Sequence, residues 1–336
     1  MLASVIIPTH NRESSVLRLL ENLQTQTMNS ENYEVLLVDD GSSDSAINWE
    51  NLKFPFEFHH IWQENQGATA ARNHGALKSR GQILVFIDDD VTISENSLQA
   101  LADACEGGTR VIALGSITAK SEDIESVYSR IASSPDQHLM YRYPESDYPV
   151  NFVECNTQVL AVSRDLFFEL NMLQDPSGGW PNWDDVDFGY RAHQAGCQFV
   201  RVIDAKGVHW DSSLADLEST SMRWFRASKS AVRLFEKYPD LKGSIPMYED
   251  KTPIRWGDDS PSLVIKKFIR KIASADSAVD LMKYIIGVLE KYIPEPGLLR
   301  PFYRWVCGAY MFQGFHQGLI EQADFHSAMA KPTQSK

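Results

Sequence analysis

The sequence predicts an α/β protein with a mostly parallel, doubly wound sheet and a helical extension at its C-terminal side. Three observations lead to this fold class. Short apolar runs alternate with helical patterns over about the first 110 residues. Three of the apolar runs end in polar, mostly acidic clusters. Beyond about residue 214, apolar residues recur at helical spacing instead.

The elements of the first part follow one another in a regular order. Strands are expected at residues 4–8, 33–38, 56–62 and 82–87, and helices at residues 14–26 and 67–77. The second helix is rich in alanine, which predicts close packing on the sheet. In doubly wound sheets, ligands bind beyond the carboxyl ends of the strands. The polar clusters occupy those ends and are therefore the first candidates for a site.

The pattern loosens after residue 110. Further strands are expected at residues 111–117 and 152–162, with a polar stretch at 121–148 between them. A loop rich in Pro, Gly and Trp at 175–183 precedes an amphipathic helix at 184–195. Long helices are then expected at residues 220–238, 262–273, 278–292 and 298–317. We divide the chain into a catalytic domain, residues 1–212, and a helical region, residues 213–336.

Composition narrows the functional classes. The chain of 336 residues carries a formal charge of −13, and such a surface repels a phosphate backbone, so nucleic acid is not expected as a partner. The four cysteines form no C-x-x-C pair, which fits a reduced, cytoplasmic setting. No run approaches the roughly 18 apolar residues of a membrane span. The apolar start is too short for a signal peptide.

The acidic triplet Asp88-Asp89-Asp90 directly follows the fourth predicted strand. Three adjacent carboxylates repel one another unless a cation offsets their charge. A hard divalent ion, bound by carboxylate and phosphate oxygens, would do so. The alternative is a turn whose acids are solvated.

Asp184 and Asp185 open a predicted helix just after Trp180 and Trp183. The flat indole faces are suited to sugar rings, so both tryptophans are candidate acceptor contacts. The helix dipole favours ionised acids in its first turn. An ionised carboxylate beside a bound donor can accept a proton from an attacking hydroxyl. Asp185 is therefore the candidate base, and the alternative is that the acids only cap the helix.

Several other polar residues have plain structural explanations. Asp187 and Arg191 are four residues apart, which predicts an ion pair on the helix surface. Asp40 lies in an Asp-Asp-Gly-Ser run that is typical of a turn. Arg72 could contact phosphate or lie on the surface. A lone histidine such as His209 is usually structural.

Four segments together resemble the family 2 glycosyltransferases, whose nucleotide-binding half has the GT-A fold. They are SVIIPTHNR at residues 4–12, LVDDGSSD at 37–44, NQGATAARN at 65–73 and VFIDDD at 85–90. Their order and intervals match the family. The resemblance extends over roughly residues 3–212, and four ordered motifs are more specific than any one of them.

The resemblance implies roles for individual residues. The implied nucleotide-sugar contacts are Pro8, Thr9, Arg12, Asp40, Arg72, Asp88 and Asp89. Asp88 and Asp90 correspond to the Asp-x-Asp that holds Mn²⁺ or Mg²⁺. His209 matches a histidine that completes the metal shell in some members. Asp184 and Asp185 belong to the acidic motif on the acceptor side, with Asp185 at the general-base position.

The implied activity is inverting transfer from a nucleotide-diphosphate sugar, with a UDP-sugar as the first expectation, to a saccharide or a lipid-linked acceptor. Two residues depart from the family pattern: His10 replaces a commoner aromatic, and Asp184 stands where Glu is frequent.

Three alternatives remain open at this point. One is a catalytically inactive protein that binds sugar nucleotides. Residues 86–92 also fit the Asp-x-Asp-x-Thr pattern of haloacid-dehalogenase-like phosphohydrolases, with Asp88 as nucleophile. Residues 36–40 faintly resemble a signalling receiver domain.

The predicted helix at 262–273 separates an apolar face from a basic one. The apolar side carries Val264, Ile265, Phe268, Ile269 and Ile272, and the basic side carries Lys266, Lys267, Arg270 and Lys271. We expect the apolar face to pack on the catalytic domain or on a second subunit, as in a homo-oligomer. The alternative is a peripheral contact with the inner face of the membrane.

Overall fold

The computed structural model describes residues 1–43, 47–107, 110–120, 126–133, 147–175, 183–243, 245 and 249–329. These residues form two compact units. The first contains residues 1–120, 147–175 and 184–211 as far as they are described. The second contains residues 126–133, Trp183 and the described residues from Ser212 onward.

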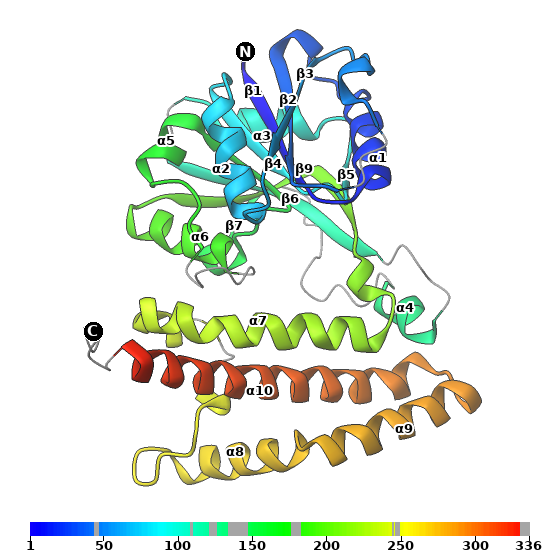
Figure 1. The fold of residues 1–336 in the computed structure, drawn as a ribbon, viewed down its shortest axis with the longest axis vertical. Helices are drawn as coiled ribbons and strands as arrows, with labels where there is room; N and C mark the ends of the chain where they lie inside the picture. The colour runs from blue at the N-terminus through cyan, green and yellow to red at the C-terminus, as the bar shows by residue number, and fades with distance from the viewer. Residues whose placement is uncertain are drawn as a thin grey trace, which may run out of the picture. The chain divides into compact units, whose positions relative to one another are not determined.

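The first unit is built on one mixed sheet (Figure 1). Its described strands are β1 (Ala3–Thr9), β2 (Tyr33–Asp40), β3 (Glu57–Gln63), β4 (Ile83–Ile87), β5 (Val91–Ile93), β6 (Val111–Lys120), β7 (Tyr148–Pro149), β8 (Val159–Ser163) and β9 (Gln198–Trp210). Their order is β3-β2-β1-β4-β8-β6-β9-β5, and β7 also pairs with β9. Strands β3, β2, β1 and β4 are mutually parallel, whereas β8 is antiparallel to both of its neighbours. The mostly parallel α/β sheet predicted from the sequence is confirmed.

Helices cover both faces of this sheet. The apolar face of α1 (Glu13–Leu23) joins the buried cluster that contains Val5 and Ile7 of β1. Side chains alternate along a strand, so Ile6 points to the opposite face. There it meets α2 (Ala68–Lys78), where a Cβ on Gly75 would stand 2.5 Å from Cγ2 of Ile6. The small residues of α2 therefore allow the close packing that the sequence predicted.

The remaining helices of the first unit are α3 (Ser97–Cys105), α5 (Arg164–Glu169) and α6 (Asp184–Gln194). The strand expected at 152–162 is only half correct. Residues Phe152–Glu154 form a single 3-10 turn, and the strand begins at Val159. The side chains of Asn151 and Glu154 bond each other's backbone N–H groups in a capping box, and these local bonds outweigh the apolar pattern.

The second unit is helical (Figure 1). It contains α4 (Val127–Ala132), α7 (Leu217–Lys237), α8 (Pro261–Ala273), α9 (Asp276–Tyr292) and α10 (Pro296–Met329). Its core includes Tyr128 from α4, Val279 and Ile286 from α9, and Leu299 and Val306 from α10. Within the described residues, no helix combines the length and apolar character that a membrane crossing requires.

Candidate active site

The acidic triplet lies where the sequence analysis expected it, directly after β4. Because β1 and β4 are parallel neighbours, the end of β1 lies beside it. Thr9 donates its hydroxyl to Asp89 Oδ2 at 2.7 Å. Arg12, in the loop after β1, approaches Asp89 at 3.2 Å and Asp90 at 2.5 Å. Burial raises the pKa of Asp89 to about 6, although the charge of Arg12 opposes this shift.

The strand β9 brings His209 to Asp90 from far along the chain. Val91 of β5 pairs with His209 in antiparallel register, and His209 Nε2 lies 3.2 Å from Asp90 Oδ1. Burial favours neutral forms at both groups, but the mutual attraction outweighs it. As a result, the pKa of Asp90 lies below its ordinary value and that of His209 above. Gln158 contacts the other ring nitrogen of His209 at 3.0 Å.

Arg72 joins the triplet to the start of α6. Its Nη2 lies 2.5 Å from Asp88 Oδ1, and its Nη1 lies 3.6 Å from Asp184 Oδ2. Thr69, in the first turn of α2, donates its hydroxyl to Asp184 Oδ2 at 2.8 Å. Arg72 is a buried site residue, so the surface interpretation of this arginine is wrong.

Asp185, next to Asp184, has a different environment. Its Oδ1 accepts a hydrogen bond from the backbone N–H of Val186 at 2.7 Å. Burial and then the charge of Asp184 raise the pKa of Asp185 to about 8, against the opposing effects of that N–H and of Arg72. Asp185 therefore binds a proton more strongly than an ordinary carboxylate does.

The donor set fits a divalent cation in its chemistry and charge. Among the described residues, buried Asp90 Oδ1 has the close contact with His209 Nε2 but no hydrogen bond of good geometry. Its 3.2 Å separation from His209 Nε2 is close to the roughly 3 Å between adjacent ligands of a six-coordinate ion with bonds of about 2.1 Å. Among the described residues of this region, five carboxyl groups contact or neighbour two guanidinium groups. The carboxyl groups are Asp88, Asp89, Asp90, Asp184 and Asp185, and the guanidinium groups are Arg12 and Arg72.

However, the three predicted metal ligands, Asp88, Asp90 and His209, do not all lie close enough together to bind one ion as they stand. In the described part of the chain, the one group of three His, Cys, Asp or Glu residues with ligand atoms all within 4.8 Å is Glu34, Glu57 and His59. Asp88 is turned toward Arg72 instead of joining Asp90 and His209 in such a group. At the other cluster, Arg80 lies 3.0 Å from Glu34 and 2.5 Å from Glu57, so a guanidinium group already balances these carboxylates.

Asp40 organises the loop that leads into α2. Its carboxylate accepts hydrogen bonds from the side chain of Gln63 at 2.7 Å and from the backbone N–H groups of Gln66 and Gly67 at 2.9 and 2.8 Å. His10 contacts the carbonyl oxygen of Asp40 at 2.9 Å. Asp40 therefore does more than form the turn that is typical of this motif, because its contacts connect the loops that follow β1, β2 and β3.

The other predicted residues are more dispersed. Pro8 is buried within β1. Trp183 belongs to the second unit and donates its indole N–H to the carbonyl oxygen of Ala227 at 2.7 Å. Trp180 lies outside the described residues.

The predicted ion pair between Asp187 and Arg191 exists, but its predicted place on the helix surface is wrong. The two groups are 2.8 Å apart, but Asp187 is completely buried. Arg191 also donates to the carbonyl oxygens of Leu170 and Met172. The pair therefore fixes α6 to the loop after α5.

Thr69 and Gln158 contact the site but were not predicted from the sequence. Of the two, only Thr69 could have been suspected, because it lies in the polar segment that begins α2.

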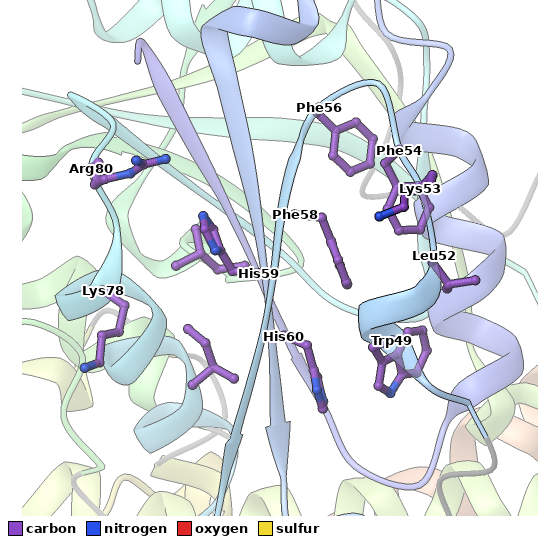
Figure 2. A pocket seen from close by; sticks show the side chains of 12 residues that line it. Trp49, Leu52, Lys53, Phe54, Phe56, Phe58, His59, His60, Lys78 and Arg80 are labelled. Carbon is purple, nitrogen blue, oxygen red and sulfur yellow. The ribbon is translucent and has the colours of Figure 1, made fainter.

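A separate groove of about 650 Å³ runs along the edge strand β3. Figure 2 shows Lys78, His59 and Arg80 on one side of the strand and the aromatic side chains of Phe54, Phe58 and Trp49 on the other. The residues that line this groove include none of the predicted site residues. The acidic site is therefore distinct from it.

Comparison with known proteins finds similarity to glycosyltransferases. The family model "Glycosyl transferase family 2" matches residues 4–163. An "Uncharacterized glycosyltransferase" of Haemophilus influenzae is 43% identical over 90 residues, which are 26% of this chain and 29% of that protein. A "Validoxylamine A glucosyltransferase" of Streptomyces hygroscopicus subsp. limoneus is 33% identical over 272 residues, 71% of this chain and 57% of that protein. The chain thus spans less than two thirds of either relative.

The fold has solved counterparts. The mannosyltransferase PcManGT from Pyrobaculum calidifontis, solved in complex with GDP-Man and Mn²⁺, superposes with a TM-score of 0.57 at 15% sequence identity, covering 95% of this chain and 87% of its own. This likeness confirms the predicted GT-A-type fold with its C-terminal helical region.

Proposed function

This chain belongs to glycosyl transferase family 2 through residues 4–163, and we propose that it transfers a sugar, with inversion, from a nucleotide-diphosphate sugar to a hydroxyl group of an acceptor. The observation that carries the proposal is the line of contacts from Asp88 through Arg72 to Asp184, with Asp185 adjoining. These contacts connect the carboxyl end of β4, where a sugar donor would bind, to the start of α6, where a general base would act.

The chain's own residues supply the binding chemistry. Arg12 and Arg72 offer guanidinium groups to a diphosphate, and Thr9 holds Asp89, which contacts Arg12. Asp88, Asp90 and His209 are the proposed holders of Mn²⁺ or Mg²⁺. Bound there, such an ion would neutralise negative charge on the departing nucleoside diphosphate. Asp40 is the proposed reader of the base.

Asp185 is the proposed general base. The acceptor oxygen forms a bond to the anomeric carbon of the sugar while the bond from that carbon to the diphosphate oxygen breaks. The hydroxyl proton goes to Asp185, whose raised pKa makes it a good proton acceptor once ionised. Asp184 is held by Thr69 and Arg72 and orients this end of α6.

The substrates are proposed by class. The donor is a nucleotide-diphosphate sugar, with UDP-sugars first and GDP-sugars next, since PcManGT was solved with GDP-Man. The acceptor is a saccharide or a lipid-linked saccharide, with Trp180 and Trp183 as the proposed contacts for its rings. The family match covers the acidic triplet, and no observation favours the phosphohydrolase or receiver-domain alternatives.

Substitution of the base tests the proposal. Asp185→Asn should keep binding of UDP or GDP with Mn²⁺ in isothermal titration and should lower the metal-dependent release of nucleoside diphosphate from the matching donor at least about 100-fold, because the proton has no acceptor. Asp165→Asn is the matched control, since Asp165 also lies in the first turn of a helix, α5, but is exposed.

Two outcomes would contradict the proposal. Near-normal release by Asp185→Asn would show that another group is the base. Tight donor binding by the unaltered protein, without release of nucleoside diphosphate to water or to any acceptor in a saccharide panel, would favour the inactive binding protein.

A further inference from the structure

Helix α8 exposes its apolar face, whereas the sequence led us to expect that face against the catalytic domain or a second subunit. Its one buried residue is Lys267, whose side chain is 2% exposed and lies 2.6 Å from Asp259. The large apolar residues of the helix are instead about 60% exposed. These are Ile265, Phe268, Ile269 and Ile272. They recur at intervals of three and four, so they form one stripe on the outer face of α8.

Helix α9 presents a second stripe of the same kind. Its inner face contributes Val279 and Ile286 to the core of the second unit. Its exposed apolar residues are Leu281, Tyr284, Val288 and Tyr292, followed by Ile293 just beyond the helix. Figure 1 shows α8 and α9 following one another along the side of α10 away from α7. The two stripes together are called the α8–α9 face below.

Basic residues accompany this face. Residues 261–273 include four Lys or Arg and no Asp or Glu, in a chain whose net charge is −13. Lys266 and Lys271 are exposed. Beside α8, a groove of about 440 Å³ adds apolar surface from Ile269 and Trp305 and a further cation from Arg304 of α10. Lys266 and Arg270 are paired with Asp250, so Lys271 and Arg304 supply the positive charge that borders the apolar surface.

We propose that the α8–α9 face binds the surface of an anionic phospholipid bilayer. The exposed stripes would enter the boundary between headgroups and acyl chains, while the bordering cations meet lipid phosphates. The rings of Tyr284 and Tyr292 suit this boundary because each combines an apolar body with a polar hydroxyl. A second copy of the chain is a poorer occupant, because a symmetric contact would bring the same basic residues together.

Flotation of the whole protein with vesicles tests this inference. The protein should float with a mixture of phosphatidylcholine and phosphatidylglycerol and far less with phosphatidylcholine alone. Raising the salt from about 0.05 to about 0.5 M should weaken the binding by screening. Phe268→Glu/Ile272→Glu should weaken binding to the mixed vesicles at least about tenfold, because two charges replace inserted apolar groups.

Leu77→Glu is the matched control. Leu77 lies on α2 of the first unit and is 57% exposed, the same fraction as Phe268, so its variant should bind like the unaltered protein. Lys271→Glu provides a second variant and should weaken binding only to the anionic vesicles. Circular dichroism checks that the variants fold.

Equal flotation of the Phe268/Ile272 variant and the unaltered protein would overturn the inference, as would flotation indifferent to lipid charge. A dimer in light scattering that the same variant converts to a monomer would also overturn it, because the face would then be an interface between copies. Release of nucleoside diphosphate from soluble donor should be unchanged, which separates this test from that of the proposed activity.

Discussion

Asp184 and Asp185 are adjacent acids with different partners. Asp184 is engaged by the hydroxyl of Thr69 and lies 3.6 Å from Arg72. Asp185 Oδ1 accepts a hydrogen bond from the backbone N–H of Val186, and burial followed by the charge of Asp184 raises the pKa of Asp185. Such a division supports the proposed roles, in which Asp184 is held in place and Asp185 accepts a proton.

The raised pKa of Asp185 has a consequence for the pH dependence of the reaction. A base acts only when ionised, so activity should rise with pH as Asp185 loses its proton, and its pKa of about 8 places the rise well above the range of an ordinary carboxylate. The rate of nucleoside diphosphate release from about pH 5 to about pH 9, at saturating Mn²⁺, measures this. A rate already constant above about pH 5 would contradict the assignment.

The sequence indicated the site only as separate segments. The triplet and the start of α6 were recognisable because acids cluster there. Partners that lie far apart along the chain were not recognisable from residue patterns, and only the family resemblance placed His209 with Asp88 and Asp90. The contact of Asp90 with His209 depends on the pairing of β5 with β9, and the bond from Thr69 to Asp184 spans 115 residues. Local patterns carry no information about such pairings.

Helices α7 and α10 pack closely because glycines lie at their crossing. A Cβ added to Gly314 would collide with the backbone carbonyl of Phe225 in α7, and one added to Gly318 would stand 2.9 Å from Cγ2 of Val232. The glycines lower the intrinsic helix propensity of α10, and packing against α7 offsets that loss. The helix was expected from the sequence, but this reason for its glycines was not.

Two alanine substitutions in α10 separate these effects. Gly314→Ala should lower the free energy of unfolding by about 1–3 kcal/mol, because overpacking exceeds the gain in helix propensity. Gly308→Ala is matched in chemistry and helix, but its added Cβ meets no atom within 4 Å, so it should raise stability by up to about 1 kcal/mol. Urea unfolding followed by circular dichroism measures both, and equal effects of the two substitutions would contradict the close crossing.

The elements that were easiest to predict are those whose apolar sequence pattern matches the burial of the element. Strands β1 and β2 are entirely buried, and their apolar runs match. Helix α8 was also predicted at nearly its observed bounds, but within this single chain its apolar face is exposed and Lys267 of its basic side is buried. Ion pairs from Lys267 to Asp259 and from Lys266 and Arg270 to Asp250 engage three of its four basic residues, and Lys267 is buried as a result. Periodicity reveals that a helix has two faces, but it does not say which face the protein covers.

The chain has a net charge of −13, and among its described residues two groups of carboxylates with a histidine are candidates for a metal site. One is Asp90 with His209 at the carboxyl end of β4, and the other is Glu34 and Glu57 with His59. Only the second has three ligand atoms already within 4.8 Å, yet Arg80 balances it. Geometry and charge therefore favour different clusters as the metal site.

A metal-dependent thermal shift decides between the two clusters. Ligand that binds only the folded state stabilises it by about 2.7 kcal/mol at roughly 100 times its Kd, so Mn²⁺ with UDP or GDP should raise the Tm by several degrees. His209→Ala should remove most of this rise, because the buried Oδ1 of Asp90 then lacks its neighbouring ligand. His59→Ala should keep it. The reverse pattern would place the ion at the Glu34 cluster, where a metal bound far from Asp88 and Asp185 could not take part in transfer.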